Sequence, residues 1–396
     1  MLKKYIPFIL LMLLQNLVAI AQVKFEKTHS VVELLAKADK ENKLIFIDGY
    51  TDWCGWCKVL DEKVFCAGAV ADTMNKYFVS TKLEMEKDSI GILLARKYAV
   101  MGFPTALILN KKGQLIVALQ GYSDKYLDRI MPIITAGVNQ PVLSGYSENI
   151  APDFPSFYIN VFAKNKKSAA FPDSATVNAF LTGRSDMTDE VSWSVFKRFY
   201  FLVNTTQQNR TLENAKTLNA LFGNDDVESV FNSMFSSNIR LAIKKHDAIA
   251  FNETLKKGQI YLTSPGWFVF NSKLSQLKAD SNWKDMVELI TRSIPDTTIG
   301  LTPSTLNQYA WDLYTDCKDK AALNAAIKWM EDPVLKKDPQ YAHRDTYAAL
   351  LYKTGNYAAA KKEAIKAIET GKLEKQKDMS ETEELVKKID AARLKN

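Results

Sequence analysis

The sequence predicts an α/β domain, in which a mixed sheet is flanked by helices, followed by an all-α C-terminal region. Two observations lead to this fold class. Short apolar runs alternate with segments of helical periodicity across residues 25–136, whereas the pattern beyond residue 155 is almost entirely helical. With 396 residues the chain is long enough for two or three domains, and its 47% hydrophobic and 24% charged residues are typical of a globular protein.

The first part of the chain, residues 1–21, has the pattern of a signal peptide. Lys3 and Lys4 precede a mostly apolar run that ends in Ala19-Ile20-Ala21, a cleavage site of the A-x-A type. An uncleaved membrane anchor is the alternative, but the run is short of the about 20 apolar residues that a spanning helix needs. We therefore expect an exported protein of the bacterial periplasm or cell envelope, which is soluble after cleavage.

The first elements of the predicted α/β domain, residues 22–136, follow from apolar spacing and capping residues. Ser30 is expected to cap a helix, and the apolar run of residues 44–47 is expected to be a buried strand. A helix over residues 56–75 and a strand over 77–85 follow. The helix over 56–75 therefore connects two strands, as in a layered α/β domain.

The second half of this domain contains a hairpin. Asp88 is expected to cap a helix, and a turn at residues 110–113 joins strands over 106–109 and 115–119. Ser123 is expected to cap the last helix. The predicted order is α-β-α-β-α-β-β-α, a small mixed sheet between helices. The residues expected to face inward from the last helix are Leu127, Ile130, Met131 and Ile134.

The rest of the chain divides into three predicted parts. Residues 137–155 contain several glycines and prolines and are expected to be a linker, 156–300 a helical region and 301–396 a pair of helical repeats. The second repeat, with Gly355 at its turn, resembles a tetratricopeptide repeat, and the helical region is therefore expected to contact protein. A shift of 38 residues matches Ala310 to Ala348, Leu313 to Leu351, Ala322 to Ala360 and Ala326 to Ala364.

The residues that carry chemistry lie at the junction between the strand at 44–47 and the next helix. Cys54 and Cys57 are spaced so that they can close a disulfide within one helical turn. We expect Cys54, at the helix start, to be the more exposed thiol and to attack a substrate disulfide, and Cys57 to resolve the mixed disulfide. Asp48, at the end of an apolar strand, is expected to have a raised pKa and to take the proton of Cys57, with Lys82 tuning that carboxyl.

The segment Trp53-Cys54-Gly55-Trp56-Cys57-Lys58 resembles the active site of thioredoxin-fold proteins. It departs from thioredoxin at Trp56, where thioredoxin has proline. The resemblance covers residues 25–136 and implies a thioredoxin-like fold and a thiol–disulfide oxidoreductase. It implies that Asp48, six residues before Cys54, is the buried carboxylate and that Lys82 lies near it.

The same resemblance implies where substrate binds. Phe103 and Pro104 match the cis-proline loop that faces the disulfide, and Gly121 matches a glycine that keeps the substrate groove open. No bound cofactor is expected, because the redox-active disulfide of Cys54 and Cys57 itself accepts and donates the electrons. The expected substrate-binding residues are Trp53, Gly55, Trp56, Phe103, Pro104 and Gly121.

Other interpretations of these residues stay open on the sequence alone. Cys54 and Cys57 could form half of a zinc site or an inert structural disulfide, but the sequence has no second C-x-x-C motif and its three histidines are scattered. Asp48 could be exposed to water, and Lys82 could be a solvated edge residue. Cys66 and Cys317 are expected to be buried thiols, and no metal site is expected.

These observations predict an exported thiol–disulfide oxidoreductase that reduces or exchanges disulfides of envelope proteins. Its expected partners are protein disulfides and a membrane electron donor, as for exported relatives of the family. Nucleic acid is not an expected partner, because the net charge of +7 is spread without a basic block. The alternative is a non-catalytic binding module, in which the helical region recognises a partner and the thioredoxin-like domain is a scaffold.

Overall fold

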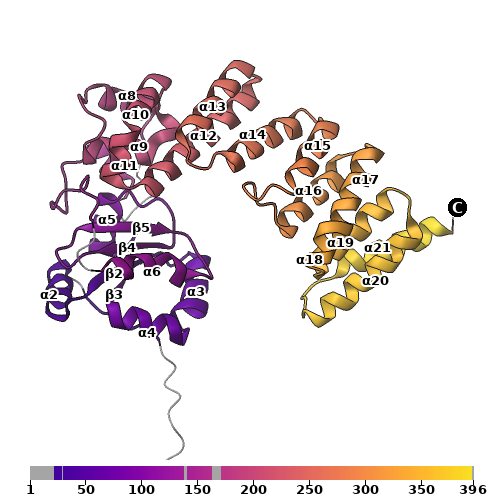
Figure 1. Ribbon diagram of the computed structural model, residues 1–396, viewed down its shortest axis with the longest axis horizontal. Helices are drawn as coiled ribbons and strands as arrows, with labels where there is room; N and C mark the ends of the chain where they lie inside the picture. Colours follow the sequence, from indigo (N-terminus) through magenta and orange to yellow (C-terminus); the bar gives the residue numbers. More distant parts are fainter. Residues whose placement is uncertain (1–21, 29, 138–140, 163–170, 395–396) are drawn as a thin grey trace, which may run out of the picture. The chain divides into compact units, whose positions relative to one another are not determined.

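The computed structural model describes residues 22–28, 30–137, 141–162 and 171–394, so the predicted signal peptide lies outside the described residues (Figure 1). Contacts between residues divide the chain into two compact units, one up to Val230 and one from Phe231 onward. The predicted mixed sheet with flanking helices lies in the first unit, and the second unit is helical.

Five strands of the described residues form one mixed sheet in the order β1-β3-β2-β4-β5. Strands β1 and β2 run parallel to β3, whereas β4 runs antiparallel to β2 and β5. The sheet confirms the predicted fold class and adds β1, which is too short to show a strand period in the sequence. The strand bounds are β1 Phe25–Glu26, β2 Leu44–Tyr50, β3 Phe78–Glu84, β4 Thr105–Leu109 and β5 Leu115–Gln120.

Helices cover both faces of the sheet because side chains alternate along each strand. Phe46 and Ile108 belong to a core with residues of α3, α4 and α6, whereas α2 and α5 contact the sheet outside that core. The C-terminal end of β2 lies beside the N-terminal end of β4, and the candidate redox site described below follows the first and precedes the second. The helix bounds are α2 Val31–Glu41, α3 Gly55–Leu60, a π-helical turn η1 Asp61–Phe65, α4 Gly68–Tyr77, α5 Ser89–Lys97 and α6 Tyr126–Ala136.

Two predicted helices differ in detail. The helix predicted over 56–75 is broken, because the π-turn is followed by an end at Cys66 before α4 begins. Asp88 precedes α5, but its Oδ2 accepts from the amide of Glu84, 3.1 Å away, and makes no cap bond to that helix. Cys66 is only partly buried, contrary to the expectation of a buried thiol.

The last helix of the α/β domain begins later than predicted. Its N-cap is Lys125 rather than Ser123. The Oγ of Ser123 accepts a hydrogen bond from the amide of Lys125 and does not cap the helix. A period of 3.6 residues then puts Ile130 and Ile133 on the buried stripe and leaves Met131 42% exposed. The inward position predicted for Met131 is therefore wrong.

The rest of the first unit contacts the α/β domain through buried polar groups. Lys97 of α5 is 4% exposed, and its Nζ lies 2.8 Å from Glu190 Oε1 and donates to the carbonyls of Ser147 and Asn149. The predicted linker therefore lies inside this unit, and the domain boundaries stay a prediction. The helices are α7 Ser156–Asn160, α8 Ser174–Thr182, α9 Glu190–Phe199, the 3-10 turn η2 Tyr200–Leu202, α10 Thr205–Glu213, α11 Ala215–Phe222 and α12 Asn224–Lys245, which continues past Val230.

In the second unit every regular element of the described residues is helical, as predicted. The alanines matched by the 38-residue shift are buried, which lets α16 and α17, and likewise α19 and α20, pack closely. The resemblance to tetratricopeptide repeats stays a prediction. The helices are α13 Ala248–Tyr261, α14 Gly266–Ala279, α15 Trp283–Ser293, α16 Pro303–Asp316, α17 Lys320–Trp329, the π-turn η3 Met330–Val334, α18 Leu335–Lys337, α19 Tyr341–Lys353, α20 Tyr357–Leu373 and α21 Ser380–Arg393. Over the described part of the chain, none of the helices combines the length and the apolar character that crossing a membrane requires.

Candidate redox site

A disulfide joins Cys54 and Cys57 where the chain leaves β2 and enters α3. Cys54 is the N-cap of α3, and its Sγ accepts from the amide of Cys57, 3.0 Å away. The two residues are 4% and 3% exposed. In this oxidised form Cys54 is therefore not the clearly more exposed residue that the sequence led us to expect. What distinguishes them is position, since Cys54 precedes the helix and Cys57 lies in its first turn.

The helix start gives Cys54 a favourable setting for a thiolate. The first amides of an α-helix have no partner within the helix, and the peptide dipoles make this end positive. An amide that points at Cys54 Sγ stabilises negative charge there once the disulfide is reduced. Gly55, the first residue of α3, is exposed and has open space where a Cβ would lie.

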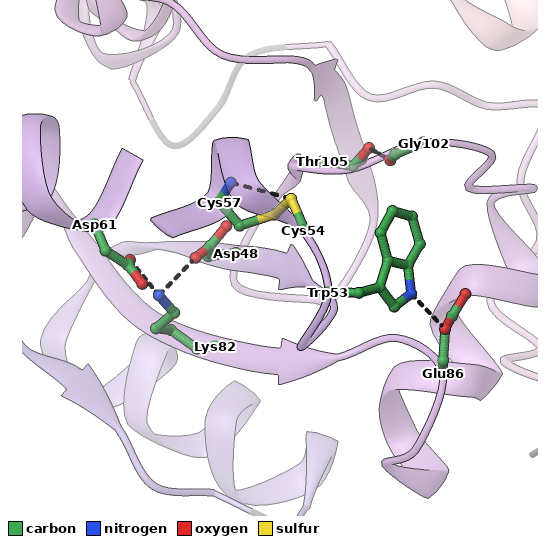
Figure 2. Close-up of a disulfide and its surroundings, with 9 residues drawn as sticks. All are labelled: Asp48, Trp53, Cys54, Cys57, Asp61, Lys82, Glu86, Gly102 and Thr105. Atoms are coloured by element: carbon green, nitrogen blue, oxygen red, sulfur yellow. Dashed lines mark hydrogen bonds and ion pairs between the residues drawn. A yellow bond between two sulfur atoms is a disulfide. The ribbon is translucent and has the colours of Figure 1, made fainter. Parts of the chain in front are cut away.

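Asp48 of β2 is buried beside the disulfide, with 1% of its surface exposed. It lies opposite Lys82 of β3 in the strand register, and Lys82 Nζ lies 3.1 Å from Asp48 Oδ2. Burial raises the pKa of Asp48 to about 6, although the charge of Lys82 opposes this rise. Figure 2 shows the carboxylate of Asp48 between the disulfide and Lys82.

Lys82 is shared between two carboxylates. Its Nζ also forms an ion pair with Asp61, the C-cap residue of α3 (Figure 2). Burial lowers the pKa of Lys82, but the charges of Asp48 and Asp61 outweigh it, so the pKa is raised. Asp61 was not predicted from the sequence, because its contact with Lys82 joins the end of α3 to β3, which local spacing does not reveal.

The loop before β4 lies against the motif. The Phe103–Pro104 peptide bond is cis, and the ring of Phe103 lies 5.9 Å from that of Trp53 in an edge-on arrangement. Trp53 Nε1 donates to Glu86 Oε2 at 2.9 Å, as Figure 2 shows. The structure therefore brings Phe103 and Pro104 to Trp53, and adds Glu86, for which the sequence held no signal.

Gly121, after β5, belongs to the same group of loops. Its amide donates to the carbonyl of Pro104 at 2.8 Å, and its φ of +85° is a conformation that other residues rarely adopt. The next residue, Tyr122, stacks on Trp56 with ring centroids 5.2 Å apart. Like Asp61 and Glu86, Tyr122 was not predicted from the sequence.

The remaining cysteines are free thiols. Cys66 ends the π-turn, and Cys317 is fully buried in the core of the second unit. Burial raises the pKa of the Cys317 thiol, which makes a thiolate there less accessible. Neither residue belongs to the Cys54–Cys57 disulfide.

The first part of the chain is similar to known proteins. The family model described as "Thioredox_DsbH: Protein of unknown function, DUF255" matches residues 19–126. The thiol:disulfide interchange protein DsbD of Klebsiella pneumoniae is 31% identical over 96 residues, which are 24% of this chain and 16% of that protein. Protein disulfide-isomerase 5-2 of Arabidopsis thaliana is 36% identical over 66 residues, which are 17% of this chain and 14% of that protein.

A Bacteroides thetaiotaomicron protein solved in solution is 36% identical and is matched over 97% of its length and 31% of this chain, with a TM-score of 0.27. The chain spans about a sixth of the length of the curated relatives that it matches. Residues 19–126, which the family model matches, contain the sheet, the disulfide, Asp48 and Lys82. The N-terminal part of this chain is therefore thioredoxin-like, and it is similar in sequence to thiol:disulfide interchange proteins.

Proposed function

We propose that this chain is a thiol–disulfide oxidoreductase that reduces or exchanges disulfides of proteins through Cys54 and Cys57. The observation that carries the proposal is the disulfide at the start of α3 with the buried Asp48 carboxyl beside it. A cysteine pair at a helix N-terminus favours the thiolate needed for attack. The similarity to thiol:disulfide interchange proteins supports the same type of reaction.

In the reducing direction the reaction starts from the dithiol. The Cys54 thiolate attacks one sulfur of a substrate disulfide, forms a mixed disulfide and releases the other substrate sulfur as a thiolate. The Asp48 carboxylate accepts the proton of the Cys57 thiol. The Cys57 thiolate then attacks Cys54 Sγ, so that the Cys54–Cys57 disulfide forms and the second substrate sulfur leaves as a thiolate. Two electrons pass to the substrate, and a dithiol donor returns two electrons before the next cycle.

The environment of Asp48 favours reduction or exchange over net oxidation. A carboxyl with a pKa of about 6 is ionised at neutral pH and is still basic enough to take a proton from Cys57. The predicted signal peptide supports export to the bacterial cell envelope. There the substrates are envelope proteins, and we propose a membrane protein as the dithiol donor.

Trapping tests this function. Cys57→Ser leaves the mixed disulfide on Cys54 without a resolving thiol, so we expect protein substrates to stay covalently attached. Cys54→Ser is the matched control and should trap none. The alternative, a non-catalytic binding module, is favoured instead if the double cysteine-to-serine variant reduces insulin as fast as the wild type.

A further inference from the structure

Trp53 and Trp56, which adjoin the two cysteines in the chain, and their ring partners Phe103 and Tyr122 form what we name the aromatic frame. They form two pairs, one on each tryptophan of the motif. The Trp53 and Phe103 rings are edge-on with centroids 5.9 Å apart, and the Trp56 and Tyr122 rings are stacked with centroids 5.2 Å apart. Each pair joins the start of α3 to a loop from a different part of the sheet.

Hydrogen bonds hold the loops that carry the frame. The amide of Gly121, next to Tyr122, donates to the carbonyl of Pro104, next to Phe103. Arg129 of α6 donates to the carbonyls of Gly121 and Gln120, at 3.0 and 2.9 Å. The two loops are therefore tied to each other, and the rings are positioned before a substrate arrives, which reduces the entropy lost on binding.

The frame is exposed, whereas the sulfurs are not. Trp53 and Trp56 are 68% and 60% exposed, but Cys54 is 4% exposed. A substrate sulfur that reaches Cys54 therefore has to approach among exposed indole rings. Its neighbours along the substrate chain meet the exposed indole rings, where an apolar or aromatic neighbour gains by leaving water.

We propose that the aromatic frame makes the site selective for protein segments in which an apolar or aromatic residue adjoins the reacting cysteine, with Trp56 and Tyr122 as the specificity-determining pair. This inference rests on the proposed function. Trp56 is the position at which the motif departs from thioredoxin, so this half of the frame is a property of this chain. The bound partner is a polypeptide, because residues next to its reacting cysteine meet the exposed Trp53 and Trp56, which flank Cys54 in the chain.

Two peptide disulfides of equal length test the proposal, one with leucine and phenylalanine beside the cysteine and one with serine. The full chain reduces each with dithiothreitol as donor, and kcat/KM is measured for both. We expect the wild type to prefer the apolar peptide at least about tenfold, and Trp56→Ala and Tyr122→Ala each to bring the ratio below about threefold. Because the ratio is taken within one variant, changes in the redox chemistry of the cysteines cancel.

Trp56→Phe keeps an aromatic ring that can stack on Tyr122, so it should retain most of the preference for the apolar peptide. This result would show that the loss in Trp56→Ala comes from the missing ring and not from a general loss of structure. Tyr77→Ala is the matched control, because Tyr77 is 37% exposed and adjoins the start of β3, whereas the site lies beyond the end of β2. A wild-type ratio near one, or an unchanged ratio in both alanine variants, overturns the inference.

Hydroxyethyl disulfide separates this failure from failure of the proposed function, since it offers no side chain to the frame. If the chain reduces hydroxyethyl disulfide and both peptides without preference, the selectivity is wrong and the oxidoreductase stands. If it reduces none of the three, the proposed function fails, and the inference fails with it.

Discussion

Lys82 Nζ lies 3.1 Å from Asp48 Oδ2, across the parallel register of β2 and β3, yet the pKa of Asp48 stays raised at about 6. Burial of the carboxyl is the largest cause and outweighs the cation, and the charge of Asp61, which also pairs with Lys82, raises the pKa of Asp48 further. The site therefore holds a buried carboxyl that changes charge close to neutral pH. Three of the predictions below depend on this balance.

The first prediction concerns stability. Because the pKa of Asp48 is about 6 in the folded chain and 3.8 for an aspartate exposed to water, the folded state binds the proton more tightly, and stability falls as the pH rises through this window. The ionised carboxyl then costs about 3 kcal/mol of folding free energy. We expect Asp48→Asn to be more stable than the wild type by up to about 3 kcal/mol near pH 8, and nearly equal to it near pH 4.

Urea unfolding of the first unit at the two pH values measures this difference. Asp39→Asn is the control, because Asp39 is an exposed partner of Lys111 and should change stability little at either pH. A gain in Asp48→Asn that does not depend on pH would contradict the raised pKa.

The second prediction concerns the rate. Without the Asp48 carboxylate, nothing in the described site takes the proton of Cys57 equally well, so the resolving step should slow by about 10². Single-turnover reduction of a disulfide peptide by Asp48→Asn should therefore accumulate the mixed disulfide on Cys54. Resolution as fast as in the wild type would exclude Asp48 as the base.

The third prediction is a pair of opposite shifts. Lys82 lowers the pKa of Asp48 and Asp61 raises it, so Lys82→Met should move this pKa up and Asp61→Asn should move it down. Carbon-13 NMR of the Asp48 carboxyl measures the pKa directly, without any assay of activity. Shifts in the same direction would mean that Lys82 does not stay between the two carboxylates.

The fourth prediction concerns the buried contact between Lys97 and Glu190. Lys97→Met leaves the Glu190 carboxylate, 9% exposed, without its cation, and should destabilise the first unit by about 3–5 kcal/mol. Lys111→Met, which removes an exposed ion pair with Asp39, should cost less than about 1 kcal/mol. Denaturant-dependent hydrogen exchange of α5 and α9 measures both changes. Equal losses of stability in Lys97→Met and Lys111→Met would contradict the argument that burial makes the Lys97–Glu190 pair costly to break.

The fifth prediction concerns Gly121. An added Cβ meets no atom within 4 Å, so the cost of Gly121→Ala comes from its φ of +85° alone and should be about 1–2 kcal/mol. Gly183 has a φ of −72° and ordinary space for a Cβ, so Gly183→Ala should be neutral or stabilising by up to about 1 kcal/mol. Urea unfolding of the two variants gives the comparison, and equal stabilities would show that the backbone conformation is not what requires Gly121.

Local patterns explain why most of the fold could be predicted. Apolar runs and their periods located β2 to β5, and Ser30 caps α2 as expected, with its side chain accepting from the amide of Glu33. The errors arose where tertiary contacts override local signals. The π-turn ends the predicted long helix, α6 begins after Lys125 instead of Ser123, and packing against the sheet buries Ile130 and Ile133 and leaves Met131 exposed.

The sequence by itself determined the pairing of Cys54 with Cys57, because a spacing of three residues at a helix start brings two sulfurs within one turn. It also indicated an ionisable group, Asp48, at the end of an apolar strand. Only the tertiary structure decided that Lys82 is shared with Asp61 and that Tyr122 stacks on Trp56. These contacts depend on strand register and on loops that meet from distant parts of the chain, and no local period encodes such distances.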